Sequence, residues 1–143
     1  LAGLRLGYLI GSGSLIEPIL AKTRDSYNID AVSQILGAAA LTDPSYAEET
    51  WQQVRAAWGM LREELTAIGF RVGISQSNFL LAEVPLDFVQ DAEEIYLALK
   101  AENILIRHFT SPAMEDKLRI TVGTETQNQR LLTALRAILK SHA

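Results

Sequence analysis

Residues 43–69 read DPSYAEETWQQVRAAWGMLREELTAIG, and this pattern predicts one long amphipathic helix. Asp43 is a favoured N-cap residue, Pro44 suits the first helical position, and Gly69 is a natural end. A helix of this length, about 40 Å at about 1.5 Å per residue, normally lies across a sheet or along a second domain. Apolar side chains recur at intervals of three and four and form one stripe, in which the tryptophans are interpreted as core residues. The stripe consists of Ala47, Trp51, Val54, Trp58, Leu61, Leu65 and Ile68.

Short strands and helices alternate after this helix. The pattern predicts strands over 70–74, 78–84, 104–108 and 118–122, with helices over 91–100 and from residue 124 onward. The last helix begins with Thr124-Glu-Thr-Gln127, which has the spacing of a capping box. The order from residue 43 onward therefore predicts an α+β fold, a small sheet covered by helices on one face.

The first 28 residues do not fit this α+β unit. Leu4–Ile10 is apolar with little alternation, which is typical of a buried strand, and a helix is expected over 15–22. We therefore expect residues 1–28 to be the last strand and helix of a larger, truncated domain. Residues 29–143 then form a small C-terminal domain, which begins with a helix over 29–41.

Composition excludes several classes of protein. The net charge is -4, and no run of basic residues with interleaved aromatics indicates a nucleic-acid partner. The sequence contains no cysteine, so disulfides and cysteine-ligated metals are excluded, and its two histidines lack ligand spacing. No window has the about 20 mostly apolar residues that a membrane span needs. We expect neither a membrane partner nor a metal, and a cytoplasmic location.

Two arginines are expected in neighbouring strands of the small sheet. Arg107 ends Ile104-Leu-Ile-Arg107, and Arg119 lies within Leu118-Arg-Ile-Thr-Val122. Converging guanidinium groups could bind a carboxylate or a phosphate. The alternative is that both are ordinary surface cations at a sheet edge.

Two further polar residues are ambiguous from local sequence. Arg5 lies in an apolar segment, where a guanidinium could bind phosphate, pair with a carboxylate or reach water. Asn78 follows Ser75-Gln-Ser77 and could contact a ligand or simply complete a turn.

Five segments occur together in an order that resembles a known family. The chain resembles the C-terminal part of fold-type-I aminotransferases, which depend on pyridoxal phosphate, and most closely the histidinol-phosphate aminotransferases. The segments are Leu1-Ala-Gly-Leu-Arg-Leu-Gly-Tyr8, Tyr27-Asn28, Asn78-Phe-Leu-Leu81, Ile104-Leu-Ile-Arg107 and Leu118-Arg-Ile-Thr-Val-Gly-Thr124.

The resemblance implies roles for the polar residues. Arg5 would bind the phosphate of pyridoxal 5'-phosphate, and residues 1–28 would end the large cofactor-binding domain. Arg119 would hold the acidic group of the substrate, with Arg107 beside it on the substrate phosphate. Asn78 would lie close to the site, and Tyr27-Asn28 would lie where the two domains join.

The resemblance also implies a reaction and its partners. The enzyme would interconvert histidinol phosphate and imidazole acetol phosphate, with glutamate and 2-oxoglutarate as the other pair, in histidine biosynthesis. It would be a homodimer. The Schiff-base lysine, the central catalytic residue, is expected upstream of Leu1. We therefore expect no catalytic residue in this chain, no bound cofactor and no activity from the chain alone.

Two alternatives remain open. A related decarboxylase acting on a phosphorylated amino acid would share these arginines. A stand-alone α+β binding or regulatory domain would have no catalytic role. An unpaired apolar strand over Leu4–Ile10 would in addition favour self-association.

Overall fold

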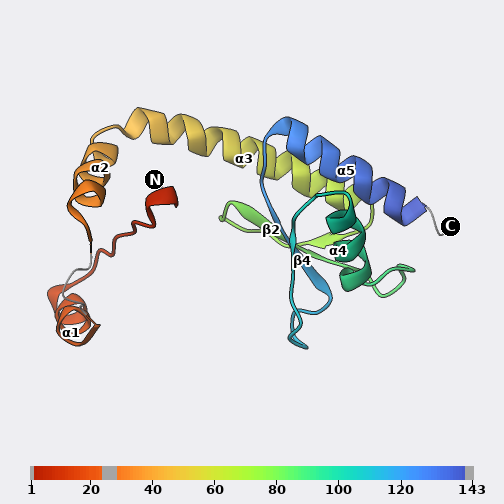
Figure 1. Cartoon of the computed structure of the whole chain (residues 1–143), viewed down its shortest axis with the longest axis horizontal. Coiled ribbons are helices and arrows are strands. Elements are labelled where there is room, and N and C mark those ends of the chain that lie inside the picture. Colours follow the sequence, from red (N-terminus) through yellow and green to blue (C-terminus); the bar gives the residue numbers. More distant parts are fainter. Residues whose placement is uncertain (1, 24–28, 141–143) are drawn as a thin grey trace. The chain divides into compact units, whose positions relative to one another are not determined.

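A computed structural model describes residues 2–23 and 29–140, and these form two compact units, Leu1–Glu49 and Thr50–Ala143. Each unit is described by itself. Figure 1 follows the chain from the first helices to the sheet and its covering helices. The elements are η1 (Ala2–Leu4), α1 (Gly13–Thr23), α2 (Ala31–Leu41), α3 (Pro44–Ala67), β1 (Arg71–Val72), β2 (Phe79–Glu83), α4 (Ala92–Ala101), β3 (Arg107–His108), β4 (Lys117–Thr121) and α5 (Glu125–Lys140).

The helices predicted in the first unit are confirmed. Helix α1 begins two residues before its predicted start, and α2 begins after Asp30. The Asp30 carboxylate accepts hydrogen bonds from the Ser33 backbone N–H at 2.9 Å and from the Ser33 hydroxyl at 2.6 Å. These bonds lower the pKa of Asp30 because they favour the charged form. Asp30 is therefore the N-cap of α2.

The strand predicted over Leu4–Ile10 is wrong. Residues 6–10 have no regular secondary structure, Arg5 has a left-handed backbone with φ of 57°, and Tyr8 and Ile10 are 76% and 84% exposed. A strand requires a hydrogen-bonded neighbour, and none of the described residues of this unit forms one. An apolar composition alone cannot supply that neighbour.

Helix α3 has the predicted ends. The Tyr46 N–H donates to the Asp43 carboxylate at 3.3 Å, and Gly69 has a φ of 105°, a left-handed value that favours glycine. The helical stripe is only partly buried. Leu61 and Leu65 are buried, whereas Trp51 is 57% exposed, so the interpretation of Trp51 as core is wrong. Only the later turns of α3 contribute fully buried side chains to the core.

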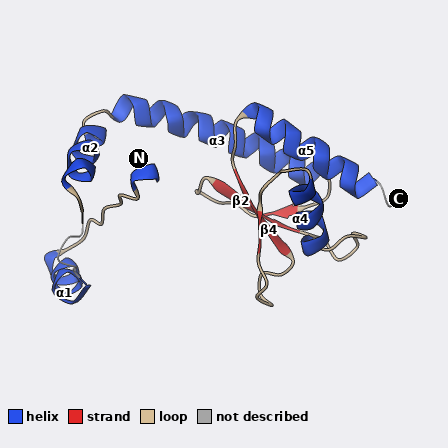
Figure 2. Ribbon diagram, in the orientation of Figure 1, coloured by secondary structure: helices blue, strands red, loops and turns tan. Residues whose placement is uncertain are grey.

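The sheet has four antiparallel strands in the order β1-β2-β4-β3. Strands β1 and β3 have two residues each and are shorter than predicted. Figure 2 shows α3, α4 and α5 on one side of the sheet, as predicted. Alternate residues of β2 and β4 face these helices. The main core residues are Leu61, Leu65, Phe70, Leu80, Ala82, Ile95, Leu99, Leu118, Ile120, Leu132 and Leu135.

The connection from β4 to α5 is fixed by one amide side chain. Asn128 is buried, its Oδ1 accepts from the Gly123 N–H at 3.0 Å, and its Nδ2 donates to the Gly123 carbonyl at 3.1 Å. The capping box predicted at Thr124 is present, because the Thr124 N–H donates to Gln127 Oε1 and the Gln127 N–H donates to Thr124 Oγ1. The strand therefore passes into the helix through a turn that these four hydrogen bonds hold.

We predict that Leu65→Ala lowers the free energy of unfolding by about 2–5 kcal/mol, because Leu65 is fully buried and its removal leaves a cavity. Denaturant unfolding measures this change. Leu86→Ala is the matched control, since Leu86 is 97% exposed and should change stability by less than about 0.5 kcal/mol. Equal effects of the two substitutions would contradict the packing described here.

Candidate anion-binding site

The face of the sheet opposite the helices brings two predicted site residues together. The register places Arg107 of β3 directly opposite Arg119 of β4, and Arg119 directly opposite Leu81 of β2. Directly opposed residues of antiparallel strands lie on the same face, with Cβ atoms about 4.5–5.5 Å apart. The predicted convergence of Arg107 and Arg119 is thus present in the strand register. Arg107 is exposed, and Arg119 is half-buried.

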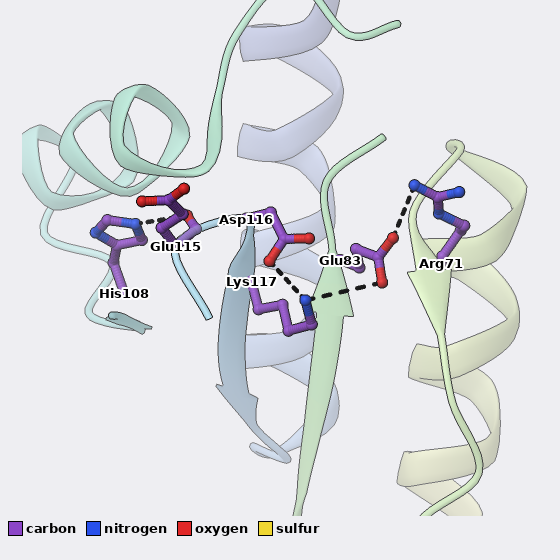
Figure 3. A network of polar contacts seen from close by, with 6 residues as sticks. All are labelled: Arg71, Glu83, His108, Glu115, Asp116 and Lys117. Atoms are coloured by element: carbon purple, nitrogen blue, oxygen red, sulfur yellow. Dashed lines mark hydrogen bonds and ion pairs between the residues drawn. The ribbon is translucent and has the colours of Figure 1, made fainter. Parts of the chain in front are cut away.

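Other cations on this face have carboxylate partners. Figure 3 shows Arg71 paired with Glu83, and Lys117 between Asp116 and Glu83. The Arg71 guanidinium lies 2.7 Å from the Glu83 carboxylate, and the Lys117 ammonium lies 2.5 Å from Asp116 and 4.0 Å from Glu83. Within the described residues, neither Arg107 nor Arg119 forms an ion pair. Like charges directly opposite each other destabilise a sheet. An anion supplied from outside the described residues would relieve this repulsion.

Each of the two arginines lies over an aromatic ring. Arg119 Cζ is 5.2 Å from the centroid of the Phe79 ring, and Arg107 Cζ is 5.4 Å from the centroid of the Phe109 ring. Both distances are within the range of cation–π attraction. The rings and the two guanidinium groups make a candidate site for a phosphate or a carboxylate.

Asn78 lies directly before β2 and is the sequence neighbour of Phe79. Its carbonyl accepts from the Val122 N–H at 2.9 Å, and its side chain is exposed. The preceding turn is held by the hydroxyls of Ser75 and Ser77, which are 2.8 Å apart. Among the described residues, the Asn78 side chain forms no hydrogen bond that completes the turn. Its role in ligand contact stays a prediction.

The remaining predicted site residues lie elsewhere. Arg5 belongs to the unit Leu1–Glu49, where it is exposed, and the expectation of a guanidinium within a buried strand is wrong because that strand does not form. Tyr27 and Asn28 lie outside the described residues. Among the residues that the structure describes, no group of three or more histidine or acidic side chains could hold a metal ion. None of the helices in this part of the chain is long and apolar enough to cross a membrane.

Phe79 and Phe109 were missed as site residues by sequence reasoning. Phe109 had a usable signal, because it follows Arg107 by two positions, and such residues share one face of an extended chain. Phe79 had none, since its position beside Arg119 depends on the register between β2 and β4. Its ring was therefore not distinguishable from a core side chain.

Comparison with known proteins agrees with the resemblance. The family model for aminotransferase class I and II matches residues 1–135. Histidinol-phosphate aminotransferase 1 of Nostoc sp. is 46% identical over 141 residues, which are 99% of this chain and 39% of that protein. The chain thus spans about two fifths of the length of this relative.

Solved structures share the fold. A histidinol-phosphate aminotransferase from Sinorhizobium meliloti, in complex with pyridoxal-5'-phosphate, matches with a TM-score of 0.82 at 22% identity. The match covers 100% of this chain and 39% of the Sinorhizobium chain. A decarboxylase from Sulfurospirillum multivorans matches with a TM-score of 0.81 at 26% identity. The match covers 97% of this chain and 40% of the decarboxylase chain.

We predict that Lys117→Gln raises the pKa of Asp116, which the hydrogen bond from Lys117 holds below the ordinary value of 3.8. A depressed carboxyl pKa means that the pair stabilises the fold above about pH 3.8, and that this stabilisation is lost as the pH falls through the lower, folded value. Carboxyl-carbon NMR titration measures the shift. Arg136→Gln is the control, because Arg136 pairs with Glu64 instead. An unchanged Asp116 pKa in Lys117→Gln would exclude the contact.

Proposed function

Since this chain belongs to the aminotransferase class I and II family, we propose that it forms the C-terminal part of a pyridoxal-phosphate-dependent aminotransferase. We assign it to the interconversion of histidinol phosphate and imidazole acetol phosphate, with glutamate and 2-oxoglutarate as the second pair. The 46% identity to the Nostoc enzyme supports this substrate class. The resemblance also implies a cytoplasmic homodimer, and both properties belong to the proposal.

The observation behind this proposal is the opposed pair of arginines without carboxylate partners. Arg119 and Arg107 present two permanent positive charges on one face of the sheet. The proposed amino transfer runs in two half-reactions, so one site must accept the phosphate of histidinol phosphate in one and a carboxylate of glutamate in the other. Planar guanidinium groups bind both anions bidentately. In the proposal, Arg119 binds the acidic group of either substrate, the phosphate of one or the carboxylate of the other, and Arg107 assists on the phosphate.

The remaining residues are assigned by the same chemistry. The exposed guanidinium of Arg5 fits a phosphate, so we assign Arg5 to the phosphate of the cofactor. When bound, the cofactor supplies an electron sink for the transfer of the amino group. Asn78, which is exposed directly before β2, is assigned to the edge of the substrate site. Residues 1–28 would complete the large domain, and residues 29–143 would form the small domain with its substrate-binding arginines.

A segment exchange tests the proposed function. We predict that the Nostoc enzyme, with its matching segment replaced by this chain, transfers the amino group between histidinol phosphate and 2-oxoglutarate. In that exchange protein, Arg119→Gln should raise the KM for histidinol phosphate and for 2-oxoglutarate about 10- to 100-fold. The substitution removes the charge-assisted hydrogen bonds to the phosphate or the carboxylate. Steady-state kinetics for both substrates measures the effect, together with circular dichroism and pyridoxal-phosphate absorbance to establish folding.

Arg71→Gln is the matched control for this experiment. Arg71 is a cation on the same face, but it is paired with Glu83 and should leave KM almost unchanged. Decarboxylation in place of amino transfer would support the decarboxylase alternative. If Arg119→Gln and Arg71→Gln behave alike, the arginine pair is not the substrate site. Should the exchange protein fail to fold, phosphate binding by this chain decides the role of the arginines.

We also predict that the described lysines of this chain do not attach pyridoxal phosphate stoichiometrically. The Lys117 ammonium is paired with Asp116, and the Lys100 ammonium lies 5.7 Å from the centroid of the Tyr96 ring. Incubation with the cofactor, borohydride reduction and peptide mass mapping measure attachment. The Nostoc enzyme is the positive control. A stoichiometric adduct at one specific lysine of this chain would reverse the assignment.

A further inference from the structure

We propose that Phe79 and Phe109 are positioning residues for anion recognition, each holding one arginine of the opposed pair on the open face of the sheet. This inference rests on the proposed function, because it concerns the same two guanidinium groups. Arg119 lies over Phe79, and Arg107 lies over Phe109. The two rings belong to segments on either side of β4: Phe79 to the neighbouring β2, and Phe109 to the residues directly after β3.

The need for such support follows from the charges. Arg107 and Arg119 are directly opposed and repel each other, and the nearby carboxylate of Glu83 already pairs with Arg71. An unsupported arginine in this position would extend into water, where it keeps the rotamer freedom that binding must remove. The face of an aromatic ring attracts the guanidinium without neutralising its charge. The ring can therefore hold each cation in place and leave its hydrogen-bond donors available for an anion.

Phe79 is itself held firmly by its backbone. Its carbonyl oxygen accepts hydrogen bonds from Trp58 Nε1 at 3.3 Å and from Ser77 Oγ at 3.1 Å. These bonds connect the residue to helix α3 and to the turn that precedes β2. The backbone that carries the ring under Arg119 is thus anchored to the fold.

Phe109 is anchored through its neighbour. His108 Nε2 donates to the Glu115 carbonyl at 2.9 Å, and the His108 ring stacks on Tyr96 with centroids 6.0 Å apart. A carbonyl can only accept, so Nε2 bears the proton. These contacts tie the residue directly before Phe109 to helix α4 and to the loop before β4, which anchors the backbone that carries the second ring.

Leucine substitutions separate the aromatic face from simple apolar volume. In this chain, Phe79→Leu and Phe109→Leu should each weaken the binding of inorganic phosphate about two- to fivefold, with the double variant showing the combined loss. Phe79→Trp should retain or strengthen binding, because tryptophan is the best aromatic partner for a cation. Calorimetry or NMR titration at low salt measures affinity. The arginine Nε–Hε resonances report whether the ring-current shift from each phenyl group is present and then lost.

Controls distinguish positioning from stability. Phe88→Leu removes an aromatic ring that packs against Phe70, and it should leave phosphate affinity unchanged. Arg119→Gln and Arg107→Gln define the full loss of the site.

The outcomes separate the positioning role from the proposed function. If the glutamine variants abolish phosphate binding and the leucine variants bind like the parent chain, the positioning role is wrong and the proposed function stands. If the parent chain binds phosphate no better than the glutamine variants, the anion site and the positioning role both fail. Weaker binding in the leucine variants, with recovery in Phe79→Trp and normal unfolding curves, supports the positioning role.

Discussion

The antiparallel register between β2 and β4 is the constraint on which the core and the candidate site both depend. It pairs Leu80 with Ile120 and Ala82 with Leu118, and these four side chains form the sheet's side of the core. The same register pairs Leu81 with Arg119 on the other face. A slip of one residue would turn the apolar side chains toward water and the arginine toward the helices. The energy of the core therefore fixes the position of the charged site.

The open face of the sheet divides into two electrostatic regions. Toward one end, Glu83 and Asp116 neutralise Arg71 and Lys117. In the other region, aromatic rings lie under the two arginines, where a carboxylate would have neutralised them. Ion pairs on exposed surfaces contribute little to stability, so this division has a small effect on folding. Its larger effect is on which cations are available to a ligand.

Local sequence was sufficient where structure depends on neighbours along the chain. The cap at Asp43, the end at Gly69 and the capping box at Thr124 were all predictable, because each uses residues within a few positions. The short predicted strands over 104–108 and 118–122 also placed Arg107 and Arg119 in neighbouring strands of one sheet, which the register confirms. Local sequence was insufficient where structure depends on distant partners. Leu4–Ile10 has a strand's composition without a strand's neighbour, Trp51 lies on a helical stripe that extends past the core, and Phe79 meets Arg119 only through the register.

The hydrogen bonds between the Asn128 side chain and the Gly123 backbone affect how β4 and α5 can move. One buried amide satisfies both backbone groups of Gly123, and the capping box at Thr124 satisfies the next residue. These hydrogen bonds hold the connection between β4 and α5 in one conformation. If a bound anion displaced Arg119, strand β4 and helix α5 would therefore move together.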